Sequence, residues 1–192
     1  MTNGATMRIS EAGWLEGARH VASPNCDARP PGVRIELIVV HNISLPPGKF
    51  GGDGIVDLFL NRLTAQAHPY YADIAHLRVS AHFLIRRDGA LIQFVPCNLR
   101  AWHAGESCWR GRARCNDFSI GIEIEGADDV PFTEAQYATL ERLTGALLNA
   151  YPSIRAVVGH EDIAPARKTD PGPCFDWARY RSASAPALSF RA

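Results

Sequence analysis

The sequence lacks an excess of charge of either sign. Its 192 residues include 20 Lys and Arg and 20 Asp and Glu, which gives a formal net charge of zero with His neutral. Without a basic excess, the chain has no general attraction for nucleic acid or for an anionic membrane surface. We therefore expect neither nucleic acid nor membrane as a partner, and the sequence indicates no obligate protein partner.

Long hydrophobic runs are also missing. No stretch of about 18 or more apolar residues occurs, so we expect no membrane-spanning segment. The N-terminal residues lack an apolar run of the length found in signal peptides, so we expect no secretory signal.

Cysteine is sparse and irregularly spaced. The five cysteines include no C-x-x-C pair, which argues against a disulfide framework and against a cysteine-rich zinc site. Together with the missing secretory signal, this favours a cytoplasmic location.

The hydrophobic patterns predict an α/β protein. The chain has the length of one ordinary domain, with no internal repeat. Strands and helices mix along the chain, and one pair of strands forms a hairpin, so we expect a single mixed β-sheet flanked by helices. The expected strands are 34–41, a hairpin over 80–95 with a two-residue turn at Asp88-Gly89, 119–126 and 154–160; the expected helices are 55–63 with Asp53 as a cap, 133–152 with Thr133 and Gln136 in a capping box, and 175–181.

Two histidines stand where strands are expected to end. His41 closes "ELIVVH" and His160 closes "AVVGH", and Asp170 follows on a loop stiffened by Pro-Gly-Pro. Two histidines, one carboxylate and an open fourth position are typical of a catalytic zinc site. Cys174 is a rival for the third position because thiolates also bind zinc. Taken singly, each histidine is better interpreted as an ordinary hydrogen-bonded residue, and the spacing alone does not overturn this.

Glu123 and Glu125 share one face of the expected strand 119–126, opposite a face of isoleucines. The pattern alone favours a solvated outer face. The functional interpretation is that one carboxylate takes a proton from water beside the metal, while Lys168 stabilises a developing oxyanion. Lys168 could instead be an exposed loop lysine.

The aromatic and polar segments around Trp102 and around residues 114–117 suit recognition of sugar and peptide. A flat ring stacks on a sugar face, and arginine binds a carboxylate with two hydrogen bonds. Simple loop packing is the alternative for Trp102.

Long motifs carry a resemblance to a known family. The segments "VVHNISLPPGKFGG", "RAWHAG", "RCNDFSIGIEIEG" and "GHEDIAPARKTDPGPCFDWAR" closely resemble the type 2 N-acetylmuramoyl-L-alanine amidases, a family that includes the peptidoglycan-recognition-protein fold. The resemblance implies a zinc amidase domain over 14–181, preceded by an extension over 1–13 and followed by a tail over 182–192.

The resemblance also implies roles for individual residues. One Zn²⁺ would be bound by His41, His160 and Asp170, which decides for Asp170 over Cys174. Glu123 would be the catalytic carboxylate, and Lys168 would stabilise the transition state. The implied substrate-binding residues are Asn42, Arg78, His82, Trp102, Arg114 and Asp117. Glu161 and Cys174 depart slightly from the pattern, and neither is an implied ligand.

The implied activity is hydrolysis of the amide bond between the lactyl group of anhydro-N-acetylmuramic acid and L-alanine. The substrates would be soluble anhydromuropeptides, in peptidoglycan recycling and, where a host has the circuit, in control of β-lactamase induction. The alternatives are a non-catalytic muropeptide sensor, a cell-wall amidase acting on intact peptidoglycan, and a glycosidase that uses Glu123 and Glu125 as its carboxylate pair.

Overall fold

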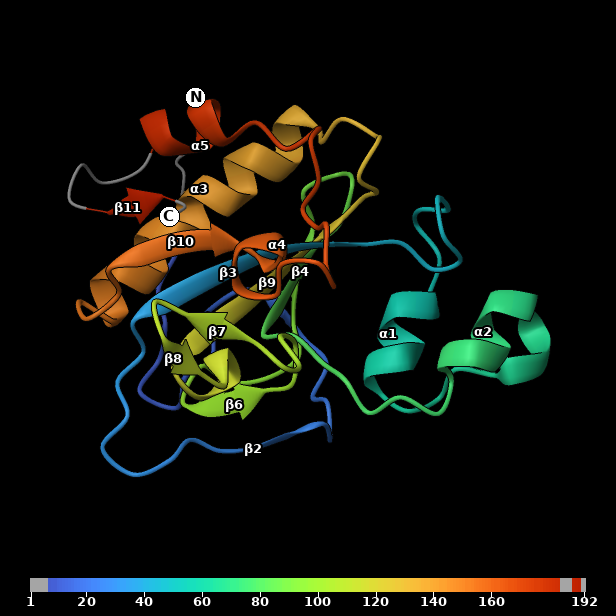
Figure 1. Ribbon diagram of the computed structural model, residues 1–192, viewed down its shortest axis with the longest axis horizontal. Coiled ribbons are helices and arrows are strands. Elements are labelled where there is room, and N and C mark those ends of the chain that lie inside the picture. Colours follow the sequence, from blue (N-terminus) through green and yellow to red (C-terminus); the bar gives the residue numbers. More distant parts are fainter. Residues whose placement is uncertain (1–6, 184–187, 191–192) are drawn as a thin grey trace.

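A mixed seven-stranded sheet forms the centre of the computed structural model, which describes residues 7–183 and 188–190 (Figure 1). The strand order is β1-β5-β4-β9-β3-β10-β11. β4 and β5 pair antiparallel, and every other neighbouring pair of this sheet is parallel, which confirms the predicted class. The strands are β1 (Arg19–His20), β3 (Leu37–Ile43), β4 (Phe83–Ile85), β5 (Leu91–Gln93), β9 (Ser119–Glu125), β10 (Ala156–Gly159) and β11 (Ser189–Phe190).

One face of the sheet packs against two helices, α3 (Glu134–Ala150) and α5 (Trp177–Ser182) (Figure 1). The isoleucines of β9 enter this core, as their alternation predicts. α3 begins with the predicted capping box: the Gln136 backbone N–H donates to the Thr133 hydroxyl, and the Thr133 backbone N–H donates to the Gln136 side chain.

The opposite face is covered in two parts. The helices α1 (Gly54–Phe59), η1 (Ala65–Ala67) and α2 (Pro69–Ile74) lie at one side, where α1 and α2 bury apolar residues against β4 and β5. At the other side, the segment 104–118, with β7 (Cys108–Trp109), β8 (Arg112–Ala113) and η2 (Cys115–Asp117), packs on β3 and β10 together with α4 (His160–Ile163). A small pair of strands, β2 (Cys26–Ala28) and β6 (Leu99–Ala101), completes the fold.

Several predicted boundaries were wrong. The first predicted strand begins at Leu37 and continues to Ile43, so His41 lies inside β3 rather than at its end. The predicted helix 55–63 ends at Phe59, and the Asp53 side chain makes no capping hydrogen bond. The predicted strand 154–160 covers only Ala156–Gly159, and His160 begins α4.

The hairpin turn also differs from the prediction. The Gly89 backbone N–H donates to the Arg86 carbonyl, and the Arg86 N–H donates to the Ala90 carbonyl. Gly89 has a φ of +82°, whereas Asp88 is not in the left-handed region. The connection is therefore a three-residue loop over 87–89, in which only the last residue needs the conformational freedom of glycine.

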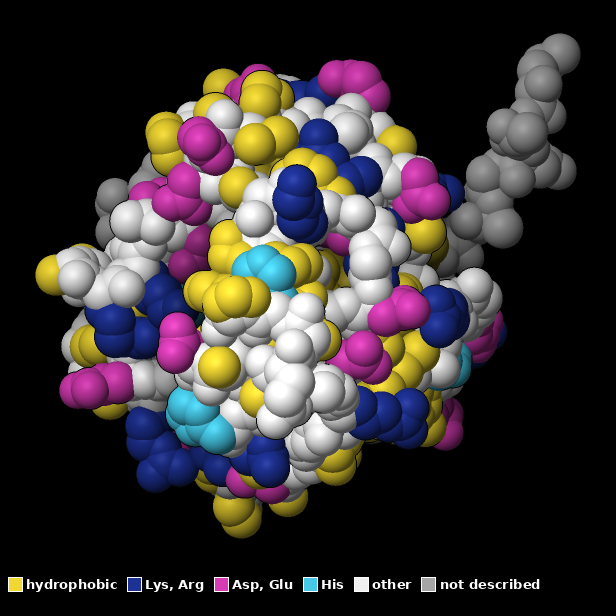
Figure 2. Space-filling model, turned by 90° about the vertical axis from the view of Figure 1, so that its right-hand side faces the viewer, with side chains coloured by type: hydrophobic (Ala, Val, Ile, Leu, Met, Phe, Trp, Pro, Cys, Tyr) yellow, Lys and Arg dark blue, Asp and Glu magenta, His cyan; other side chains and the backbone are white. Residues whose placement is uncertain are grey.

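The face of the molecule shown in Figure 2 has no concentration of one charge. Acidic and basic side chains are interspersed on the face that carries α1 and α2. Within residues 7–183 and 188–190, no helix has the length and apolar character that crossing a bilayer requires. All five cysteines are free thiols.

Candidate metal centre

The centre of the sheet places His41 and Glu123 side by side. His41 of β3 and Glu123 of β9 are register partners on adjacent parallel strands. Register partners project from the same face of a sheet. That face is the one divided between α1 and α2 on one side and the segment 104–118 on the other, and the two side chains lie between these coverings.

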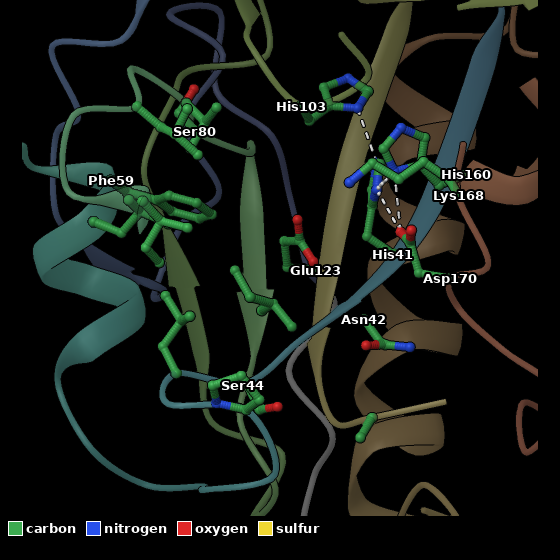
Figure 3. A pocket seen from close by; sticks show the side chains of 18 of the residues that line it. His41, Asn42, Ser44, Phe59, Ser80, His103, Glu123, His160, Lys168 and Asp170 are labelled. Atoms are coloured by element: carbon green, nitrogen blue, oxygen red, sulfur yellow. Dashed lines mark hydrogen bonds and ion pairs between the residues drawn. The ribbon is translucent and has the colours of Figure 1, made fainter. Parts of the chain in front are cut away.

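Two further residues bring their ligand atoms to His41. His160 follows β10 directly, and Asp170 lies on the loop after α4 (Figure 3). The His41 Nδ1 atom lies 3.0 Å from His160 Nδ1 and 3.0 Å from Asp170 Oδ2, and the latter two atoms are 3.1 Å apart. The three residues predicted as ligands therefore form one cluster.

The cluster fits a zinc ion. A tetrahedral ion roughly 2.0–2.1 Å from each ligand keeps the ligand atoms about 3.3 Å apart, close to the spacing observed. The outward nitrogens of both rings already have partners: His160 Nε2 lies 3.1 Å from the Ala104 carbonyl, and His41 Nε2 lies 3.0 Å from His103 Nδ1. A carbonyl only accepts, so His160 carries its proton on Nε2 and turns a bare Nδ1 towards the cluster.

The charges of the cluster also suit a cation. Burial, followed by the neighbouring His160, lowers the pKa of His41 to about 4, which keeps the ring neutral at physiological pH. Burial acts to raise the pKa of Asp170, but the neighbouring His160 and His41 outweigh it and hold that pKa well below its usual range. Neutral imidazole and ionised carboxylate are the forms that bind metal.

The loop that carries Asp170 is fixed from both sides. The Glu161 backbone N–H donates to the Asp170 carbonyl over 3.0 Å, and the Asn42 side-chain amide donates to the Pro171 carbonyl over 3.1 Å. Among the described residues, the cluster contains Asp170 and not its rival Cys174. The geometry therefore supports Asp170 as the third ligand.

The two glutamates of β9 have different surroundings. Glu123 is 8% exposed, and its Oε2 atom has no hydrogen-bond partner. Burial, followed by the charge of Asp170, raises the pKa of Glu123 well above its usual range, against the opposing effect of Lys168. The prediction that the glutamate face of β9 is solvated is wrong, because α1, α2 and the segment 104–118 cover that face.

Glu125 is 1% exposed and fully engaged. Its carboxylate accepts from the Arg86 guanidinium over 2.9 Å, from the Gly51 backbone over 2.8 Å and from the Arg87 backbone over 3.2 Å. It ties the 44–54 loop to the hairpin turn, so it is a structural residue. A carboxylate pair formed by Glu123 and Glu125, as a glycosidase would need, is therefore not available.

A cavity of about 440 Å³ opens onto the cluster. One wall is apolar and comes from α1, α2 and the segment that follows, while the other holds the cluster, Glu123 and Lys168. Glu123 lies between His41 on one side and Phe59 and Ser80 on the other (Figure 3). The Lys168 side chain extends towards the cluster from the loop after α4 (Figure 3).

The residues expected to bind substrate fall into two groups. Asn42 and Trp102 line the cavity. The Trp102 ring is held by its indole N–H, which donates to Asp27 over 3.1 Å. Four others are absent from the lining, namely Arg78, His82, Arg114 and Asp117.

Existing partners occupy all four of these residues. His82 is fully buried, and its Nδ1 accepts from the Gly121 backbone over 3.0 Å. The exposed Arg78 donates to carbonyls of its own segment, 75–77. Asp117 pairs with Arg100 and Arg114.

His103 is a cavity residue for which the sequence suggested no role at the metal. It lines the cavity beside Trp102 and contacts His41 directly. In the sequence, the neighbouring Trp102 indicates sugar recognition. The contact between His103 and His41 depends on the fold and leaves no sequence pattern.

Known proteins are similar to this chain in both sequence and fold. Residues 31–173 match the family model for N-acetylmuramoyl-L-alanine amidase. The chain is 61% identical over 174 residues to the 1,6-anhydro-N-acetylmuramyl-L-alanine amidase AmpD of Escherichia coli, covering 90% of this chain and 95% of that protein. A crystal structure of a selenomethionine derivative of AmpD has a TM-score of 0.89 and 58% identity, covering 91% of this chain and 98% of that one.

A more distant structure contains a ligand. The complex of the amidase AmiD from Escherichia coli with the substrate anhydro-N-acetylmuramic acid-L-Ala-D-γ-Glu-L-Lys has a TM-score of 0.58 and 31% identity, covering 94% of this chain and 67% of that one. The extent of the family match and the identity to full-length relatives establish that this chain belongs to the N-acetylmuramoyl-L-alanine amidase family.

Proposed function

We propose that this chain is a zinc-dependent amidase that cleaves the bond between the lactyl group of anhydro-N-acetylmuramic acid and L-alanine in soluble anhydromuropeptides. The observation that carries the proposal is the Glu123 carboxylate, whose Oε2 atom has no hydrogen-bond partner, beside three converging metal-ligand atoms in an open cavity. The name of the Escherichia coli relative and the ligand of the AmiD complex support this substrate class.

His41, His160 and Asp170 would hold the ion at the wall of the cavity. A zinc ion held there supplies Lewis-acid chemistry, which polarises a carbonyl group and makes water more acidic. The rest of the reaction depends on the residues of the chain.

Glu123 acts as the general base and then as the general acid. Its carboxylate takes a proton from the attacking water and passes that proton to the alanine nitrogen as the amide bond breaks. The Oε2 atom of this buried carboxyl has no hydrogen-bond partner, so it is available to take up the proton.

Lys168 faces the negative charge that develops on the substrate carbonyl oxygen. An ammonium group already in place stabilises this charge without reorganisation of solvent. Asn42 and Trp102 contact the substrate from the cavity walls. Arg78, His82, Arg114 and Asp117 remain proposed substrate-binding residues, each of which would have to exchange its present partners.

The cellular role proposed is recycling of anhydromuropeptides in the cytoplasm. The name of the Escherichia coli relative and the ligand of the AmiD complex both contain an anhydromuramyl sugar, which supports an anhydromuropeptide as the substrate. In a host with an inducible β-lactamase, the same hydrolysis would lower the concentration of the inducing muropeptide.

Mass spectrometry of the products tests the proposal. The purified protein is given anhydromuramyl-tripeptide or intact peptidoglycan, each with and without a chelator. We expect free tripeptide from the soluble substrate only, abolished by chelation and restored by Zn²⁺. Release from peptidoglycan as well would favour a cell-wall amidase, and no cleavage with zinc bound would favour a muropeptide sensor.

A further inference from the structure

We propose that His103 is a positioning residue for the metal site, which fixes the tautomer of His41 through a hydrogen-bonded chain that ends at Ser119 and the Cys115 carbonyl. The proposal rests on the zinc site of the proposed function. His103 would contact neither the ion nor the scissile bond and would act only through His41.

The direction of each hydrogen bond in the chain follows from its last member. Ser119 Oγ lies 2.6 Å from the Cys115 carbonyl, which can only accept, so the single hydroxyl proton is used there. The His103 Nε2 atom lies 3.1 Å from the same Oγ and must therefore be the donor. A neutral His103 with its proton on Nε2 presents a bare Nδ1.

That bare nitrogen meets His41. His103 Nδ1 lies 3.0 Å from His41 Nε2, which must carry the proton of the bond. The His41 Nδ1 atom is then free of a proton and turned towards His160 and Asp170. Three groups, the His103 ring, the Ser119 hydroxyl and the Cys115 carbonyl, thus set the one tautomer of His41 that can bind an ion from Nδ1.

The same segment supports the second histidine ligand. The Ala104 carbonyl accepts from His160 Nε2 over 3.1 Å. Asn116 holds both residues of this dipeptide, because its Oδ1 accepts from the His103 backbone N–H over 3.2 Å and from the Ala104 N–H over 2.9 Å. One dipeptide therefore orients both imidazole ligands.

The strand below is shaped to receive the His103 ring. Gly121 of β9 lies under it, and a Cβ atom at that position would approach His103 Cγ to 2.4 Å. Ser119, Gly121 and Glu123 share one face of β9 by the two-residue period of a strand. On this face, Ser119 belongs to the hydrogen-bonded chain, Gly121 leaves space for the His103 ring, and Glu123 is the proposed general base.

Zinc affinity and tautomer state test the proposal. His103→Leu keeps bulk but removes the acceptor, and we expect the zinc Kd to rise about 10–100-fold, the usual cost of losing an outer partner of a ligand. His103→Asn can place its Oδ1 near the position of Nδ1, so we expect it to recover most of the affinity. Ser119→Ala frees the His103 tautomer without touching His41, and we expect an intermediate loss.

Nitrogen-15 NMR of the metal-free wild-type protein at pH 8 gives a readout that does not depend on catalysis. We expect His41 to carry its proton on Nε2, with Nδ1 bare, and the Ser119→Ala protein to show a mixture. His76→Asn, at an exposed histidine, is the matched control and should leave both measurements unchanged.

The outcomes separate this proposal from the proposed function. A wild-type protein with the expected tautomer but no zinc affinity would defeat the zinc enzyme and leave the positioning role. A His41 ring protonated on Nδ1, or a folded His103→Leu protein that binds zinc as tightly as wild type, would overturn the role of His103. If His103→Leu fails to fold, the tautomer measurement and Ser119→Ala still decide.

Discussion

His41 and Glu123 lie side by side on one face of the sheet, as register partners on the adjacent parallel strands β3 and β9 in its middle. Neighbouring strands lie roughly 4.8 Å apart, so backbone hydrogen bonds fix the spacing between the first proposed metal ligand and the proposed base. Residues on central strands hold their geometry better than residues on loops. Of the proposed metal-binding and catalytic residues, His160, Asp170 and Lys168 lie on the segment after β10 and lack this support.

Replacement of Glu123 tests the proton transfer. Glu123→Gln keeps the shape of the side chain but cannot take up a proton, so we expect the kcat for anhydromuramyl-tripeptide to fall about 10²-fold or more. Zinc content should stay at one ion per chain, measured on the same sample. Near-normal turnover with zinc bound would show that another group moves the proton.

Replacement of Glu125 should affect stability instead. Its ion pair with Arg86 is buried, and removing one partner of such a pair costs about 3–5 kcal/mol. We expect Glu125→Gln to lower the free energy of unfolding by an amount in this range, measured by urea denaturation. Addition of Arg86→Met to this variant should cost little more, whereas equal further loss would mean that the two residues are not coupled.

Lys168 can be compared with the only other lysine in the sequence, Lys49. We expect Lys168→Met to lower kcat about 10²–10³-fold, the effect of removing one group that stabilises an oxyanion. KM and zinc content should change little, because the charge acts on the transition state. Lys49→Met, at an exposed loop position, should behave as wild type; an equal loss in both variants would point to general electrostatics.

The proposed third metal ligand, Asp170, can be tested against its rival, Cys174. We expect Asp170→Asn to weaken zinc binding more than about 100-fold, since even loss of an outer partner costs 10–100-fold. Cys174→Ser should retain the ion, because Cys174 lies outside the cluster. Metal content after dialysis and competition with a chromophoric chelator measure both. The reverse ranking would make the thiolate the ligand.

The metal cluster could be predicted because its members stand on strongly patterned segments. The β-branched run before His41 and the run before His160 identify strands, and the unusual "KTDPGP" motif identifies the loop of Asp170. The family resemblance that these motifs carried is confirmed by the comparisons. The residue pattern alone left Asp170 and Cys174 open, since both lie near the same loop; the family resemblance favoured Asp170, and the cluster contains it.

The difference between Glu123 and Glu125 could not be predicted from the strand. Their alternation is identical, and what separates them is the Arg86 guanidinium and the Gly51 backbone, which reach Glu125 from distant segments. His103 was missed for the same reason, because its role depends on Ser119, 16 residues away. The helix α2 was not predicted, because it has too few residues for a clear helical period.

The raised pKa of Glu123 predicts how stability depends on pH in the metal-free protein. Burial raises this pKa in the folded state, so between the unfolded value of about 4.3 and the folded value the folded protein binds more protons than the unfolded one. The stability contributed by the protonated carboxyl is present below pH 4 and is lost as pH rises through the folded pKa. Glu123→Gln removes this titration.

We therefore expect Glu123→Gln to stabilise the chelator-treated protein relative to wild type, and more at pH 8 than at pH 4.5, by urea denaturation. Each unit of pKa elevation corresponds to about 1.4 kcal/mol. Glu134→Gln is the control with the opposite sign, because a hydrogen bond from Arg179 lowers the pKa of Glu134. A pH-independent difference for Glu123→Gln would mean that Glu123 titrates normally.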